Sequence, residues 1–156
     1  MRYFELSQDL DVPFRAGIVN TIKIGGYDEA KQGDFYKLDN AIVSLVDSEA
    51  LDSTPDILDR QLFMIKGAVK EVFDMFLPRI QYKHCIMTER VKKRYERYYI
   101  PLLEVFGEDD SIETVAEGRH IFRIVNEQKN MVVASLEVIE ALLRRNPIGV
   151  KTDVLF

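Results

Sequence analysis

Residues 120–156 decide the fold, and they are HIFRIVNEQKNMVVASLEVIEALLRRNPIGVKTDVLF. The alternation of side chains over 120–125 predicts a strand, the polar run 126–130 a turn, and 131–134 a returning strand. A helix over 135–145 follows, capped by the Ser135 hydroxyl and ended by Pro147. We assign its apolar face to Leu136, Ile139, Leu142 and Leu143. Residues 148–156 are then predicted to form a final strand.

The preceding segment contains a second helix, predicted over about 65–77. Its apolar residues recur at helical spacing, and Pro78 ends it; they are Ile65, Val69, Val72, Phe73 and Phe76. A strand over 80–86 follows, with His84 on its apolar face. Residues 88–106 fit either a hairpin that turns near 89–93 or a helix that Pro101 would break. We favour the hairpin, because residues 95–105 are rich in strand-forming side chains.

The N-terminal third predicts short strands at 1–6, 18–24 and 41–46. The second of them carries Ile18, Ile22 and Ile24 on one face and stops at Gly25-Gly26. Residues 47–59 are acidic and predict a surface connection. Because hairpins are mixed with single helices, the fold class is α+β: a mixed or antiparallel sheet of hairpins with two main helices, at about 65–77 and 135–145. We expect residues 1–156 to form one domain.

Length and composition exclude several protein classes. A chain of 156 residues with 47% hydrophobic residues can bury a core without metal or disulfide support. Cys85 is the single cysteine, which excludes an intrachain disulfide and is typical of a reducing compartment. The sequence has no apolar run long enough to span a membrane, and its acidic start is unlike a signal peptide. We therefore expect a cytoplasmic protein without a membrane partner.

The net charge of −5 is unevenly distributed along the chain. Residues 1–59 carry −7, residues 60–99 carry +6 and residues 100–156 carry −4. The negative total argues against a nucleic-acid partner, because phosphate binding needs a concentrated basic face. The basic, tyrosine-rich stretch 90–99 is a candidate for such a site, because basic residues beside aromatic ones can contact phosphates and stack on bases. We interpret it instead as a solvated hairpin or as an intramolecular partner for the acidic N-terminal third.

The sequence predicts no catalytic, cofactor or metal site. Its two histidines, His84 and His120, lie in strands and are expected to be buried, hydrogen-bonded structural residues. Cys85 points to the opposite side of its strand from His84, so the two form no catalytic pair. Several acids fall near one another in the sequence, but acids in loops are typically solvated; they are Glu104, Glu108, Asp109, Asp110 and Glu113.

The last third of the chain resembles a family of bacterial immunity proteins of polymorphic toxin systems. The matching residues form an Ile-Phe-Arg strand, a Ser-Leu pair, and a Glu, Leu-Leu-Arg-Arg and Gly pattern: Ile121-Phe122-Arg123, Ser135-Leu136, Glu140, Leu142-Leu143-Arg144-Arg145 and Gly149. The segment PDILDRQLFMIKGAVKEVFDMFLP is similar to the strand and helix of the same family. The match covers mainly residues 55–156, whereas residues 1–50 match weakly. The family provides no catalytic residues to carry over.

The resemblance implies a non-enzymatic protein that binds and neutralises a cognate protein toxin. The alternatives are a structural or adaptor domain, with a self-association surface, and an undetected enzyme. For the partner surface we predict the acidic loop Glu108, Asp109, Asp110 and Glu113, because complementary charge accelerates association with a basic partner. The identity of the toxin and the oligomeric state stay open.

Overall fold

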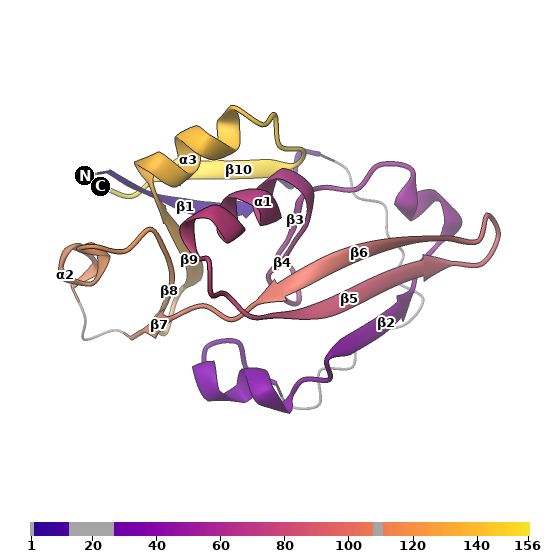
Figure 1. The fold of residues 1–156 in the computed structure, drawn as a ribbon, viewed down its shortest axis with the longest axis horizontal. Coiled ribbons are helices and arrows are strands. Elements are labelled where there is room, and N and C mark those ends of the chain that lie inside the picture. The colour runs from indigo at the N-terminus through magenta and orange to yellow at the C-terminus, as the bar shows by residue number, and fades with distance from the viewer. Residues whose placement is uncertain (1, 13–26, 108–110) are drawn as a thin grey trace.

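The computed structural model describes residues 2–12, 27–107 and 111–156, and its strands form two five-stranded sheets (Figure 1). The first sheet has the order β10-β1-β9-β8-β7, made of Val150–Val154, Tyr3–Gln8, Asn130–Ser135, Ile121–Val125 and Val105–Phe106. The second has the order β2-β5-β6-β4-β3, made of Ala41–Leu45, Tyr82–Glu89, Arg94–Pro101, Met64–Ile65 and Ile57–Leu58. Each sheet contains one parallel pair, β7 with β8 and β2 with β5. The α+β class is confirmed.

The helices are α1 (Gly67–Phe76), α2 (Ile112–Ala116) and α3 (Leu136–Leu143), with short 3₁₀ helices η1 (Gln32–Lys37) and η2 (Ser48–Leu51). Helices α1 and α3 pack against one another beside the junction of the two sheets (Figure 1). One core cluster combines residues from both sheets and both helices, among them Leu6, Ile65, Val72, Val132 and Leu142. The two sheets therefore share a hydrophobic core.

Gly149 lies at a close backbone contact between the segment that leads into β10 and the segment that leads into β3. It has a φ of +67°, and a Cβ placed on it would lie 3.2 Å from the Pro55 Cα. The close approach allows the Asp56 N–H to donate to the Ile148 carbonyl at 2.7 Å and the Ile148 N–H to donate to the Asp56 carboxylate at 3.1 Å. Only glycine combines this conformation with this space.

The predicted hairpin over 88–106 is confirmed, since β5 and β6 pair antiparallel from Tyr82–Pro101 to Glu89–Arg94. The helix predicted at 65–77 begins later, at Gly67, because Ile65 lies in β4 and pairs with Tyr99. The strand predicted at 18–24 and the turn at Gly25-Gly26 lie outside the described residues.

Two assignments of buried faces were wrong. In β5 the buried side chains are Lys83, Cys85, Met87 and Glu89, while His84 lies on the half-exposed face. Two charged residues can be buried there because they are satisfied, as Lys83 donates to the Asn40 side-chain oxygen at 2.8 Å. In α3, Leu142 is buried, whereas Leu143 is 57% exposed.

No helix among the described residues is both long and apolar enough to cross a membrane.

Candidate functional site: an open sheet face and its basic hairpin

One face of the β2–β5–β6 sheet is covered over much of its length by no helix or loop among residues 2–12, 27–107 and 111–156. The register places Val43 beside Ile86 and Ile86 beside Arg97, so these side chains project from the same face. Tyr95 projects from this face one step further along β6, opposite Thr88. Val43 is 67% exposed and Tyr95 is 66% exposed. We call Val43, His84, Ile86, Tyr95 and Arg97 the open face.

The opposite face of the same sheet is fully packed. Ile42, Cys85 and Tyr98 meet there with Phe35 and Leu38 in a second core cluster. Burial raises the pKa of the Cys85 thiol to about 11, so this cysteine is an inert core residue. The sheet is therefore rigidly supported from behind while its front is open to solvent.

Helix α1 covers only one end of the solvent-exposed face of the β2–β5–β6 sheet. There the Lys70 ammonium lies 4.7 Å from the Tyr99 ring centroid and donates to Asp74 at 2.7 Å. The Tyr82 hydroxyl also donates to Asp74, at 2.8 Å. Burial and the Asp74 carboxylate raise the pKa of Tyr82. This closed cluster marks the boundary at which the open face begins.

His84 lies between the covered end and the open end. Its ring meets the Tyr99 ring edge-on at 5.2 Å, and burial, with the cations Arg97 and Lys70 nearby, lowers its pKa. Among the described residues, its Nδ1 is buried without a hydrogen-bond partner. We expected His84 to be a buried, hydrogen-bonded structural residue. For this ring nitrogen the expected hydrogen bond is absent among the described residues, so the expectation is wrong there.

His120 is hydrogen-bonded, as expected, but it is half-buried rather than fully buried. Its Nδ1 lies 2.9 Å from the Ser135 hydroxyl, and its ring packs 4.9 Å from that of Phe76. The backbone N–H of Glu137, and after it the Ser135 hydroxyl, hydrogen-bond the Glu137 carboxylate and lower its pKa. Ser135 is completely buried, so its hydroxyl cannot reach a substrate and the three residues form a structural network. The hydroxyl is used here rather than as the predicted helix cap.

The residues that carry the family resemblance make structural contacts. Arg123 is 4% exposed; its guanidinium donates to the Asn130 side chain at 2.8 Å and lies 3.5 Å from Glu29. Arg145 lies 3.5 Å from Glu71 of α1. Together with Gly149, these residues hold the first sheet to its surroundings. Arg123, Arg145 and Gly149 therefore belong to the scaffold, and the open face is built from other residues.

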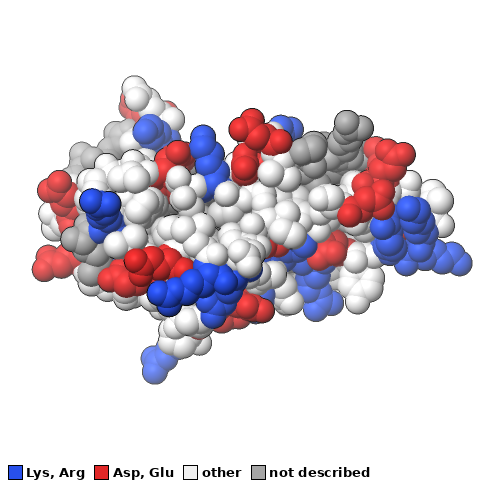
Figure 2. All heavy atoms as spheres, turned by 90° about the horizontal axis from the view of Figure 1, so that it is seen from above, with Lys and Arg blue, Asp and Glu red and all other residues white. Residues whose placement is uncertain are grey.

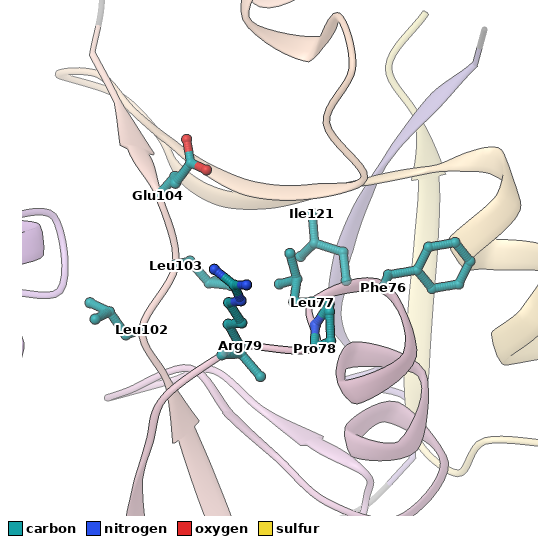
Figure 3. A pocket seen from close by; sticks show the side chains of 9 residues that line it. Phe76, Leu77, Pro78, Arg79, Leu102, Leu103, Glu104 and Ile121 are labelled. Carbon is teal, nitrogen blue, oxygen red and sulfur yellow. The ribbon is translucent and has the colours of Figure 1, made fainter.

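A pocket of about 300 Å³ lies at the junction of the two sheets, where α1 leads into β5 (Figure 3). It is lined by Phe76, Leu77, Pro78, Arg79, Ile80, Leu102, Leu103, Glu104 and Ile121. Only Arg79 and Glu104 in this lining have polar side chains, and Glu104 lies 3.2 Å from Arg119. A nucleophile with an adjacent base is not part of this lining. Elsewhere in the described ranges, no three His, Cys, Asp or Glu side chains come together as a metal site.

Of the predicted acidic site, the structure describes only Glu113. It lies exposed in the first turn of α2, at the opposite end of the molecule's long axis from the β5–β6 turn (Figure 1). Glu108, Asp109 and Asp110 lie outside the described residues. The acidic partner surface stays a prediction.

Sequence reasoning missed the open face. The alternation of Tyr95, Arg97 and Tyr99 is typical of a strand, but alternation alone does not tell which face other elements cover. The second interpretation of 90–99, as a partner for the acidic N-terminal third, is confirmed at one place. Arg94 lies 2.8 Å from Asp52 and also donates to the Ser48 carbonyl.

Comparison with known proteins identifies no relative: no family model matches the chain, and no curated protein or solved structure shows significant similarity to it.

Proposed function

We propose that this chain is an immunity protein that neutralises a bacterial toxin by binding it, and that the toxin contacts the open face. The observation that carries the proposal is the open face itself, a rigid sheet surface on which apolar, tyrosine and arginine side chains are exposed together. Protein interfaces are enriched in tyrosine and arginine, and exposed apolar patches are typical of binding sites. The resemblance to immunity proteins provides the kind of partner.

The proposed mechanism is stoichiometric occlusion. The sheet is held from behind by the core cluster around Tyr98 and Met87, so binding orders few additional groups. Tyr95 can bury a large ring at little entropic cost, since its backbone is already fixed by pairing with Thr88. Arg97 offers a planar donor group to a carboxylate or carbonyl of the toxin.

The test begins with a search for a secreted protein with a C-terminal toxin domain encoded beside this gene. That domain is then used with two pairs of matched variants. Tyr95→Ala is compared with Tyr36→Ala, because Tyr36 is 64% exposed but lies on η1, away from the open face. Val43→Ser is compared with Val154→Ser, because Val154 is 65% exposed on β10 of the other sheet. We expect Tyr95→Ala to weaken toxin binding by about tenfold or more, and its control to change it less than about twofold.

The proposal fails if the toxin domain does not bind, or if both members of each pair behave alike. It also fails if a small fraction of the immunity protein inactivates an excess of toxin, since turnover of that kind indicates an enzyme. If the chain instead self-associates and Tyr95→Ala dissociates it into monomers, the open face is a self-association surface and the adaptor interpretation holds.

A further inference from the structure

The turn between β5 and β6 is a basic projection at one extreme of the molecule (Figure 1). We call Arg90–Lys93 the hairpin tip. Val91, at its apex, is 80% exposed, and Arg90, Lys92 and Lys93 are also exposed. Figure 2 shows Lys and Arg side chains gathered at this end of the molecule, with Asp and Glu side chains beside them.

The hairpin tip is held in one conformation by a buried carboxylate. Glu89 accepts hydrogen bonds from the backbone N–H groups of Lys92, at 3.0 Å, and Arg94, at 3.1 Å. Burial alone would raise the pKa of Glu89, but these N–H groups and the Arg94 guanidinium hold it below its ordinary value of 4.5. Lys93 has a φ of +53°, a conformation that the ionised Glu89 and its hydrogen bonds maintain.

A second element supports the hairpin from the side. The Arg94 guanidinium bridges Asp52 and the Ser48 carbonyl, which ties the base of the hairpin to η2. A projecting turn that is fixed before binding loses less conformational entropy on docking than a mobile one. The geometry is that of a preformed docking element.

The charges of the hairpin tip are incompletely neutralised within the molecule. Lys92 lies 3.6 Å from Asp52. In the described part of the chain, neither the Arg90 guanidinium nor the Lys93 ammonium forms an ion pair. Beside the tip lies a groove of about 470 Å³, whose lining includes Arg90, Asp47 and Glu49. Basic and acidic groups thus alternate across a short distance.

We infer that the hairpin tip docks into an acidic recess of the toxin, with Arg90 and Lys93 facing toxin carboxylates and Val91 entering an apolar spot between them. Asp47 and Glu49 then face a basic group at the rim of the recess, which fixes the register of the complex. This inference rests on the proposed function and names the chemistry of the partner surface.

A protein partner fits these observations better than a nucleic acid. A nucleic-acid strand presents phosphates without interruption, and Asp47, Glu49 and Asp52 beside the tip would repel it. A protein surface can alternate its charges to match.

The test compares two doubly charge-reversed variants with the same change in net charge. The tip variant is R90E/K93E, and the control is K129E/R144E, at two exposed positions on other elements. Association with the same toxin domain is measured by stopped-flow at about 20 mM and 300 mM salt. We expect the tip variant to associate at least about tenfold more slowly at low salt, and to differ less at high salt, because ions screen the lost attraction. The control should stay within about threefold of the wild type.

Three outcomes would overturn the inference. In the first, the tip variant and the control associate equally fast while Tyr95→Ala still weakens binding; the proposed function then stands and the tip plays no part. In the second, the wild-type protein does not bind the toxin domain, and both proposals fail. In the third, the wild-type protein binds a fluorescent 20-mer of oligouridylate tightly and R90E/K93E abolishes this binding, so the tip recognises nucleic acid.

Discussion

Replacing Gly149 by alanine tests the backbone contact that joins the two sheets. At a φ of +67° an L-residue with a Cβ is strained by about 1–2 kcal/mol. The new Cβ would also lie 3.2 Å from the Pro55 Cα and still nearer the Pro55 Cβ, and overpacking of this kind costs about 1–3 kcal/mol. We therefore expect Gly149→Ala to lower the free energy of unfolding by about 2–5 kcal/mol.

Two other glycines separate the strain from the clash. Gly118 has a φ of +74°, but a Cβ there would meet nothing within 4 Å, so Gly118→Ala should cost only the strain of about 1–2 kcal/mol. Gly33 has neither a positive φ nor a close neighbour, and Gly33→Ala should be neutral or stabilising by up to about 1 kcal/mol. The difference in unfolding free energy between Gly149→Ala and Gly118→Ala isolates the contact with Pro55.

The assay is urea unfolding followed by far-UV circular dichroism, because the chain has no tryptophan for fluorescence. A Pro55→Gly/Gly149→Ala double variant removes the opposing Cβ and should recover part of the loss. If Gly149→Ala and Gly118→Ala agree to within about 0.5 kcal/mol, the close approach of the two sheets is not what requires glycine, and the argument is refuted.

Two further predictions concern the helix face and the hairpin. Leu142→Ala should cost about 2–5 kcal/mol in urea unfolding, whereas Leu143→Ala should cost less than about 0.5 kcal/mol; equal losses would contradict the assigned face. Because the folded pKa of Glu89 is below its ordinary value of 4.5, its contribution to stability is present above pH 4.5 and is lost as the pH falls through the folded pKa. Wild-type stability should therefore fall more steeply below pH 4.5 than that of Glu89→Gln, and parallel curves would show that the buried carboxylate does not maintain the turn.

The sequence predicted best where the determining interactions are local. The strand, turn, strand and helix over 120–145 follow from alternation, a polar turn and a proline after the helix, all within a few residues. The β5–β6 hairpin was predicted for the same reason, since its strand-forming residues flank a short polar turn. Such patterns act through neighbouring backbone groups, so they can be recognised without knowing the tertiary structure.

The tertiary structure alone decided which faces are buried and which are free. Arg123 is buried because Glu29 and Asn130 satisfy its guanidinium, and Glu29 is far from it in the sequence. His84 lies on the half-exposed face of β5 because the opposite face packs on Phe35, which η1 brings beneath the sheet. Burial of a strand face depends on what distant segments cover it. The open face of β2, β5 and β6 exists because α1 covers this sheet only as far as Tyr82 and Tyr99. A local pattern of residues cannot encode how far a distant helix extends over a strand.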